Sequence, residues 1–311
     1  MTSVPLLSTT HRRMLINESG IADEVIRERS YRSLDGANGF QELKALGFST
    51  AQAKLRPGLL LPLHSTDGRQ PLTVYRPDQP SLDRNGRLRK YLLPPGTSVR
   101  LDCPPRCQPS LADPGVPLWL TEGQKKADAL ASCGAVVVDL LGVWNFKGKN
   151  PLGGTTLLAD FDYVGWNGRA VRLVFDNDIL TLQSVRQALD RLSEHLRRRG
   201  ATVRVVYLPP TPGKKLGVDD YLVDGHTLQD LEALIQAPRP QPQPAPSQVE
   251  LLDSAPTCMR RPLALIDGRM YAAIWPYVKL TRTEALDKQG KVVRLATPEV
   301  TTEQRMLRVF N

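Results

Sequence analysis

Cysteine and histidine are scarce in this sequence and widely scattered. Four cysteines are too few for a disulfide framework, and Cys103 and Cys107 form a single Cys-x3-Cys spacing without a second pair. None of the four histidines stands at metal-ligand spacing from another. A proline-rich loop with two thiols therefore explains Cys103 and Cys107 better than a zinc site does.

Long hydrophobic runs and nucleotide-binding loops are missing as well. No apolar run approaches the roughly 20 residues that a membrane-spanning helix requires, and the first residues lack the basic-then-apolar pattern of a signal peptide. We therefore expect a cytoplasmic protein without a membrane partner. No Gly-x-x-x-x-Gly-Lys-Ser/Thr loop occurs, so this stretch of chain has no ATPase site of its own.

The composition is that of a folded, basic protein. The 311 residues are 41% hydrophobic, which is enough to fill the core of one substantial domain and a smaller one. The 41 Lys and Arg residues outnumber the 32 Asp and Glu residues and give a net charge of +9. This excess favours a polyanionic partner or a phosphate-bearing substrate.

Changes of pattern along the chain divide it into five predicted segments. Residues 1–57 are predicted to be a helical lead-in, with one helix over 22–34, and residues 58–115 a basic, β-rich segment. Residues 116–236 form an α/β domain, and the alternating prolines of 237–248 indicate an extended linker. Residues 249–311 are predicted to be a small β-rich appendage or the start of a further module.

The segment 116–236 alternates between short apolar runs and amphipathic stretches. Strands are expected at 116–121, 135–140, 171–175 and 203–208, and helices at 124–132 and 182–199. Such alternation implies right-handed crossovers and a mainly parallel sheet flanked by helices. The predicted fold class is therefore α/β, preceded by a small α+β N-terminal region.

Three carboxylates follow the predicted strands of this domain. Glu122 comes after the first strand, and Asp176 and Asp178 come after the third. In an open parallel sheet the site forms beyond the carboxyl ends of the strands, so these side chains can converge. Hard cations such as Mg²⁺ or Mn²⁺ prefer carboxylate oxygens, and Glu122 can complete the metal cluster or act as general acid or base. An isolated Asp-x-Asp, however, is common on loops and helix caps.

Basic residues lie near these carboxylates and in the β-rich segment. Between Arg84 and Arg100 the basic residues occur without an acid and surround Tyr91, which suits either a nucleic-acid backbone or a solvated hairpin. Asp219 and Asp220 are either accessory acidic residues or caps of the following helix. The candidate substrate- or nucleic-acid-binding residues are Arg76, Arg89, Lys90, Tyr91, Lys125, Lys126, Lys147, Lys214 and Lys215.

The order of strand, Glu-Gly, helix, strand and Asp-x-Asp resembles the Toprim domain of bacterial-type primases, topoisomerases and some nucleases. The stretches Leu120-Thr-Glu-Gly-Gln-Lys-Lys-Ala-Asp-Ala-Leu130, Phe175-Asp-Asn-Asp178 and Gly217-Val-Asp-Asp-Tyr-Leu222 look most like the Toprim-like domain of phage and plasmid replication proteins. This resemblance covers residues 8–235. It implies that Glu122 is the acid/base carboxylate and that Asp176 and Asp178 hold Mg²⁺ or Mn²⁺.

The resemblance also implies a function, with one departure. Many cellular primases have an acidic residue four positions after the glutamate, where this chain has Lys126. We expect a primase-like nucleotidyltransferase that makes short primers on single-stranded DNA from nucleoside triphosphates, with a replicative helicase or ATPase module as a possible partner. The alternatives are a Toprim-type nuclease that uses the same carboxylates and a non-catalytic module that binds single-stranded nucleic acid.

Overall fold

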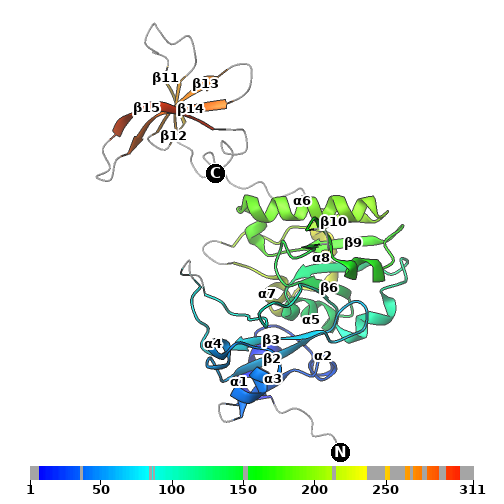
Figure 1. Cartoon of the computed structure of the whole chain (residues 1–311). Helices are drawn as coiled ribbons and strands as arrows, with labels where there is room; N and C mark the ends of the chain where they lie inside the picture. The colour runs from blue at the N-terminus through cyan, green and yellow to red at the C-terminus, as the bar shows by residue number, and fades with distance from the viewer. Residues whose placement is uncertain are drawn as a thin grey trace, which may run out of the picture. The chain divides into compact units, whose positions relative to one another are not determined.

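The chain divides into two compact units, Met1–Gln241 and Pro242–Asn311. The computed structural model describes residues 7–35, 38–83, 86, 88–149, 153–211 and 215–236, and the strands between 249 and 301 (Figure 1). The predicted linker 237–248 lies outside the described residues. None of the helices in the described part of the chain is long and apolar enough to cross a membrane.

The first unit begins with four short helices and a small antiparallel sheet. The helices are α1 (Thr9–Ile16), α2 (Asp23–Glu28), α3 (Gly39–Ala45) and α4 (Thr50–Ala53). The strands β1 (Arg32–Leu34), β2 (Gly58–Leu63) and β3 (Leu72–Pro77) pair in that order. Both faces of the sheet are apolar, because Leu59 and Leu61 pack with α1 and α2 while Leu60 and Tyr75 pack with α3 and α4.

The helix predicted over residues 22–34 is wrong in its second half. Helix α2 ends at Glu28, and residues 32–34 form β1, which pairs with β2 through Arg32 and Leu60. Ser30 has a φ of +56°, a left-handed conformation that a continuous helix does not allow. Burial of Arg29 and Tyr31 on either side of this residue outweighs the local helical pattern.

A five-stranded sheet forms the centre of the first unit. Its order is β10 (Thr202–Val206), β9 (Ala170–Val174), β5 (Leu118–Glu122), β6 (Val136–Leu140) and β4 (Leu101–Asp102). All neighbours are parallel except β4, which runs antiparallel to β6. The predicted α/β class and mainly parallel sheet are confirmed. Because β4 precedes residue 116, the boundary predicted there falls inside this sheet.

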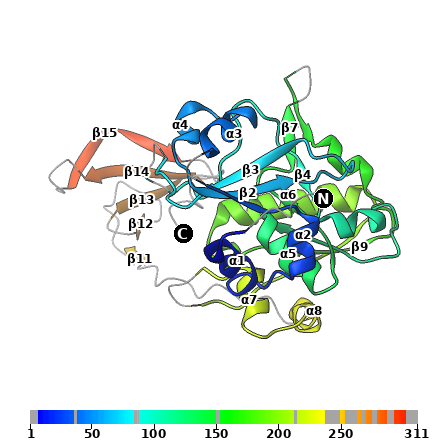
Figure 2. The ribbon, with the colours of Figure 1, turned by 90° about the horizontal axis from the view of Figure 1, so that it is seen from below.

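Helices cover the central sheet. Helix α5 (Gln124–Ser132) connects β5 to β6, and α6 (Gln183–Arg198) runs along β9 and β10 in Figure 1. Helix α7 (Val218–Val223) lies beside α5, and α8 (Leu228–Gln236) packs against β10; Figure 2 shows these helices from another side. Shorter elements are η1 (Pro105–Ser110), β7 (Lys147–Lys149), β8 (Thr155–Leu157), η2 (Ala159–Tyr163) and η3 (Asn177–Leu180).

One large hydrophobic cluster joins the sheet to its helices. Val185, Leu189 and Leu192 form the apolar face of α6, and all three are buried in this cluster. Cys103 and Cys107 belong to the same cluster as buried free thiols. Their Sγ atoms contact the carbonyl oxygens of Pro104 and Ala135, which suits core residues.

The second unit is an antiparallel sheet of consecutive strands. These are β11 (Val249–Leu252), β12 (Leu263–Ile266), β13 (Arg269–Ile274), β14 (Lys279–Leu286) and β15 (Val292–Thr301). Strands β12 and β13 form a hairpin, with Ile266 opposite Arg269. Strands β14 and β15 form another antiparallel pair.

Candidate functional site

The carboxyl ends of β5 and β9 lie next to each other at one edge of the central sheet. The two strands pair in parallel, with Leu120 opposite Leu173. Glu122 is the last residue of β5, and Asp176 lies two residues beyond the end of β9. Both side chains line one pocket of about 570 Å³. The predicted convergence of these two carboxylates is therefore observed.

This pocket also receives residues from the small N-terminal sheet and from the region of α7. The pocket is lined by Val74, Lys90, Tyr91, Leu93, Glu122, Gly123, Gln124, Lys125, Lys126, Leu141, Gly142, Asp176, Lys215, Gly217, Asp219 and Asp220. Four acidic and four lysine side chains are among them. The pocket therefore has balanced charge of both signs, which suits a ligand that itself carries both phosphates and a cation.

Gly123 turns the chain sharply from β5 into α5. Its φ of +99° favours glycine, and its N–H donates to the carbonyl oxygen of Leu140 at 2.9 Å. The turn places Gln124, Lys125 and Lys126 in the first turn of α5, at the pocket. The Lys125 Nζ atom donates to Ser19 Oγ at 2.6 Å, and burial lowers the pKa of Lys125.

Two lysines bind the carboxylate of Asp176. Lys126 Nζ lies 2.5 Å from Asp176 Oδ1, and Lys215 Nζ lies 2.8 Å from Asp176 Oδ2. Lys215 also reaches Asp178 Oδ2 at 2.7 Å, so that one ammonium group joins both aspartates. Burial disfavours the charge of each lysine, but the contacts with these aspartates outweigh it and raise the pKa of both.

The carboxylates are not grouped as the sequence predicted. Asp176 precedes the 3₁₀ helix η3, so the backbone of 176–178 is not extended, and Asp178 does not line the pocket. Among the described residues, no three His, Cys, Asp or Glu side chains gather as a set of metal ligands. Asp176 and Asp178 nevertheless converge on a single cation, the ammonium group of Lys215. A pair of carboxylates sharing one cation fits the donors that Mg²⁺ or Mn²⁺ uses.

The electrostatic environment of Glu122 differs from that of Asp176 and Asp178. Burial raises the pKa of its carboxyl group, and the neighbouring charge of Lys126 opposes this only in part. A carboxyl group with a raised pKa takes up a proton more readily than an ordinary glutamate. Glu122 therefore suits proton transfer better than permanent charge pairing.

Asp219 and Asp220 have different roles. The Gly217 N–H donates to Asp220 Oδ2 at 2.9 Å, which caps the first turn of α7 and confirms the cap interpretation for Asp220. Asp219 is buried in the pocket, and burial raises the pKa of its carboxyl group. Gly217 lies against this group, because a Cβ atom there would be 2.5 Å from Asp219 Oδ1 and 2.8 Å from Lys126 Cε.

Only some of the predicted basic residues reach this pocket. Lys90 and Tyr91 line it, and burial raises the pKa of Tyr91 against the opposing effect of the charge of Arg76, whereas Arg89 is exposed and does not line the pocket. Lys147 lies elsewhere, in a hollow of about 780 Å³ beside β7 and β8, with Nζ 4.6 Å from the centre of the Trp144 ring. Lys214 lies outside the described residues.

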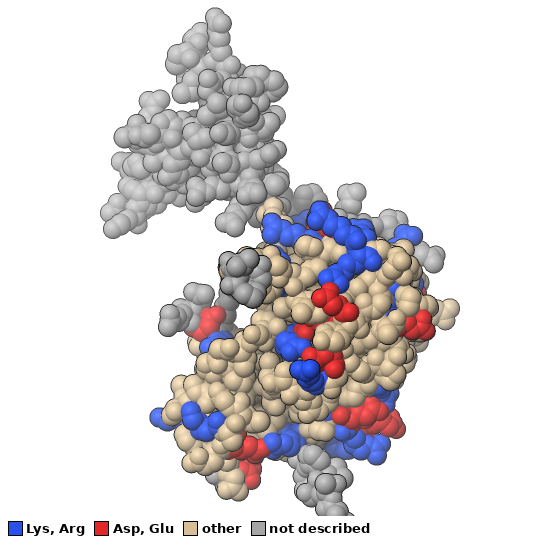
Figure 3. All heavy atoms as spheres, turned by 45° about the vertical axis from the view of Figure 1, so that its right-hand side comes forward, with Lys and Arg blue, Asp and Glu red and all other residues tan. Residues whose placement is uncertain are grey.

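The charged surface is mixed rather than basic on the face that Figure 3 shows. Lys and Arg side chains lie there next to Asp and Glu side chains. The net charge of the chain therefore does not correspond to a uniform basic surface on this face. Any recognition of phosphates depends on where individual lysines and arginines stand.

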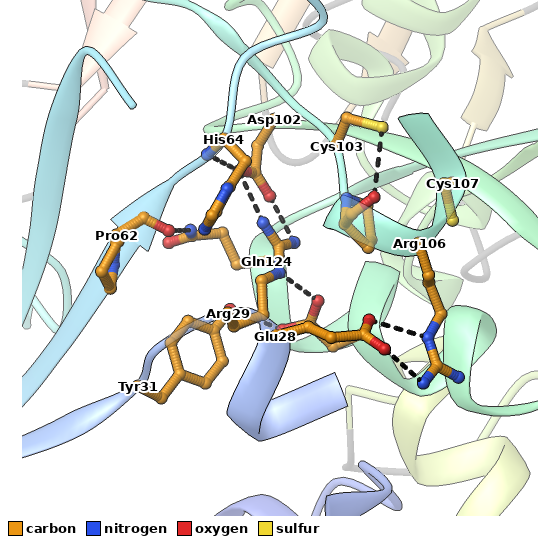
Figure 4. A network of polar contacts seen from close by, with 12 residues as sticks. Glu28, Arg29, Tyr31, Pro62, His64, Asp102, Cys103, Arg106, Cys107 and Gln124 are labelled. Atoms are coloured by element: carbon orange, nitrogen blue, oxygen red, sulfur yellow. Dashed lines mark hydrogen bonds and ion pairs between the residues drawn. The ribbon is translucent and has the colours of Figure 1, made fainter. Parts of the chain in front are cut away.

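A buried polar network near the pocket was not predicted. The Arg29 guanidinium points at Asp102, to which Nη1 and Nη2 donate at 2.9 and 2.6 Å (Figure 4). Its Nε donates to Asp128 Oδ1 at 2.6 Å, and the Tyr31 hydroxyl donates to the other oxygen of Asp128. Arg29, Asp102 and Asp128 are fully buried. The network therefore ties α2 to β4 and α5, the helix that carries Lys125 and Lys126.

Two carboxyl groups of this network have raised pKa values. Burial raises the pKa of Asp128 to about 6, and it raises the pKa of Asp139 well above the usual range. Asp139 lies opposite Asp102 in the pairing of β4 with β6. An acidic residue inside the apolar run Val136–Leu140 was the one sequence signal that could have revealed this network.

Comparisons with known proteins found a matching family model, a relative and several similar solved structures. Residues 108–227 match a family described as a domain of unknown function, DUF3854. An uncharacterized protein of Picosynechococcus sp. (strain PCC 7002) is 32% identical over 123 residues, which are 37% of this chain and 12% of that protein. This chain therefore matches only a small part of that longer relative.

Among solved structures, the chain is similar to primase domains. The zinc-binding and RNA polymerase domains of Aquifex aeolicus primase are 18% identical, with a TM-score of 0.49, 74% of this chain covered and 56% of the other. The E. coli primase catalytic core is 20% identical, with a TM-score of 0.46, covering 73% and 72%. The primase fragment of the bacteriophage T7 primase-helicase is 14% identical, with a TM-score of 0.41, covering 75% and 80%.

Proposed function

We propose that the pocket at the ends of β5 and β9 is the active site of a Toprim-type, primase-like nucleotidyltransferase. The enzyme makes short primers on single-stranded DNA from nucleoside triphosphates and serves replication of the phage or plasmid kind, together with a helicase or ATPase module. One observation carries this proposal. Glu122 and Asp176, from two adjacent parallel strands, line a single pocket together with Lys125, Lys126 and Lys215.

Asp176 and Asp178 are the residues that would hold Mg²⁺ or Mn²⁺. Their oxygens already converge on one ammonium group, at 2.8 and 2.7 Å from Lys215 Nζ. When bound there, such a cation would neutralise the developing charge on the phosphates during transfer. The two carboxylates would fix the position of the cation at the edge of the sheet.

Glu122 and the lysines supply the remaining chemistry. Glu122 accepts the proton of the primer 3′-hydroxyl group, a role for which its raised pKa suits it. Lys125 and Lys126, in the first turn of α5, hold phosphate oxygens through charge-assisted hydrogen bonds. The helix N-terminus adds backbone N–H groups that favour an anion at the same place.

The template is held by the N-terminal sheet side of the pocket. Lys90 lines the pocket there, and Tyr91 is 44% exposed, so that its ring is available for stacking with a base. The charge of Arg76 acts on Tyr91 and adds a cation on this side of the pocket. Bases and backbone of a single strand can both be recognised by this combination of an aromatic ring and cations.

A synthesis assay tests the proposal. Labelled nucleoside triphosphates, single-stranded DNA and Mg²⁺ or Mn²⁺ are incubated with the wild type, Glu122→Gln and Asp176→Asn. Glu232→Gln is the control, because Glu232 is paired with Arg172 at 2.7 Å and does not line the pocket. We expect short labelled products, reduced about a hundredfold or more in the two pocket variants and unchanged in the control.

The same assay separates two other functions. Shortening of the DNA without use of nucleotides, lost in both pocket variants, would identify a Toprim-type nuclease. Binding of single-stranded DNA that survives both substitutions, with neither synthesis nor cleavage in the wild type, would identify a non-catalytic binding module. Either result would replace the nucleotidyltransferase proposal.

A further inference from the structure

The acidic side chains of the pocket already have cationic partners. Lys126 Nζ and Lys215 Nζ lie 2.5 and 2.8 Å from the two oxygens of Asp176, whose side chain is only 4% exposed. Lys215 also neutralises Asp178 at 2.7 Å. The two ammonium groups therefore stand on the carboxylate oxygens that a divalent cation would need.

The charges of the pocket make separate binding of a cation or of an anion unfavourable. A free divalent cation approaching Asp176 meets two ammonium groups, and a free triphosphate meets Glu122, Asp176 and Asp219. A nucleoside triphosphate that carries its cation offers both partners at once. The carboxylates can then take the cation while the lysines take the phosphates.

The two lysines differ in their surroundings, since the side chain of Lys126 is 20% exposed and that of Lys215 is the more exposed of the two. The side chain of Lys215 is 56% exposed, which leaves its ammonium group free to turn towards a ligand. Lys126 lies across Gly217, where a Cβ atom would be 2.8 Å from its Cε. The absence of a side chain at Gly217 leaves the space that Lys126 occupies. Lysine suits such an exchange because its charge is a compact group on a flexible chain.

We propose that Lys126 and Lys215 are exchangeable counter-ions of Asp176 and Asp178. In this arrangement the carboxylate pair accepts a divalent cation only when the phosphates of a nucleoside triphosphate take the two ammonium groups. The inference rests on the proposed function and adds to it an order of events: cation and nucleotide enter together, and the cation alone is excluded. A purely structural ion pair would show no such coupling.

Binding of Mn²⁺ to the intact chain tests the exchange without any turnover. The unbound Mn²⁺ is measured by electron paramagnetic resonance for the wild type, Lys126→Met, Lys215→Met and the control Lys44→Met. Lys44 is an exposed residue of α3 outside the pocket, so its replacement changes the net charge equally. Circular dichroism verifies the fold, and replacing each lysine singly leaves a second test if one variant does not fold.

We expect both pocket variants to bind Mn²⁺ alone about tenfold more tightly than the wild type and the control, since an opposing charge is removed. A non-hydrolysable nucleoside triphosphate should raise the Mn²⁺ affinity of the wild type by about tenfold or more, and by less in the two variants. Equal Mn²⁺ affinity of wild type and pocket variants, or no effect of the nucleotide on the wild type, would overturn the exchange.

The outcome is distinguishable from failure of the proposed function. If Mn²⁺ binding follows the expected pattern but no primer is made, the exchange stands and the nucleotidyltransferase does not. If primer synthesis requires Asp176 while the lysine variants bind Mn²⁺ as the wild type does, the function stands and the exchange does not. Asp176→Asn should abolish Mn²⁺ binding, and binding that persists in this variant would also refute the exchange.

Discussion

Replacing Arg29 by methionine should destabilise the protein more than any exposed charge replacement. Methionine keeps part of the aliphatic stem but removes the guanidinium that donates to Asp102 at 2.9 and 2.6 Å and to Asp128 at 2.6 Å. Both carboxylates are fully buried and would remain without this cation. Removing one partner of such a buried pair costs about 3–5 kcal/mol.

The remaining contacts of the two carboxylates place the loss at the lower end of this range. Asp102 still accepts the backbone N–H of His64 at 2.9 Å, and Asp128 still accepts the Tyr31 hydroxyl. We therefore expect the free energy of unfolding to fall by about 3 kcal/mol in Arg29→Met. Arg29→Lys should also have a lowered free energy of unfolding, because an ammonium group cannot make the paired contact with Asp102.

Urea unfolding followed by far-ultraviolet circular dichroism measures this change. The control is Arg12→Met, because Arg12 and Asp23 form an exposed pair, with side chains 54% and 46% exposed, worth about 0.2–1 kcal/mol. Adding Asp102→Asn and Asp128→Asn to Arg29→Met should recover part of the loss, since the buried charges are then gone. A loss below about 1 kcal/mol in Arg29→Met would refute the reasoning.

Three further predictions concern single groups. Burial raises the pKa of Asp128 to about 6, so the folded state binds the carboxyl proton more tightly than the unfolded chain does. The free energy of unfolding should therefore rise as the pH falls from 7 to 4, and it should rise less in Asp128→Asn. Urea titrations at each pH would measure both changes. Gly58→Ala should lower the free energy of unfolding by about 1–3 kcal/mol, because its Cβ would lie 2.5 Å from the carbonyl oxygen of Arg76 in the neighbouring strand; an unchanged urea midpoint would contradict this. Gly217→Ala should cost less than about 1 kcal/mol, because its close neighbours are side-chain ends, yet it should weaken nucleotide binding by displacing Lys126, as calorimetric titration would measure.

The central domain could be predicted because its signals are local. The apolar strands and the amphipathic helix α6 follow from the periodicity of the sequence. The rule that sites form at the carboxyl ends of parallel strands predicts that Glu122 and Asp176 lie close together, and both line the same pocket. The pattern could not show that Lys215 reaches Asp176, because this contact depends on how the chain before α7 returns to the sheet.

The Arg29 network could not be predicted for a related reason. Arg29 is 73 residues from Asp102 and 99 from Asp128, and no local pattern links residues at such separations. The same network explains why the helix predicted over residues 22–34 ends early. Burying Arg29 and Tyr31 requires the chain to leave the helical conformation after Glu28. Tertiary contacts there outweigh helix propensity.

Anomalous diffraction from crystals grown with Mn²⁺, a non-hydrolysable nucleoside triphosphate and a short single strand tests the central claim most directly. We expect a manganese peak bound to Asp176 and Asp178, with Lys126 and Lys215 moved onto the phosphates and Glu122 facing the primer hydroxyl group. A nucleotide bound elsewhere, or lysines that still hold both aspartates beside a bound nucleotide, would contradict it.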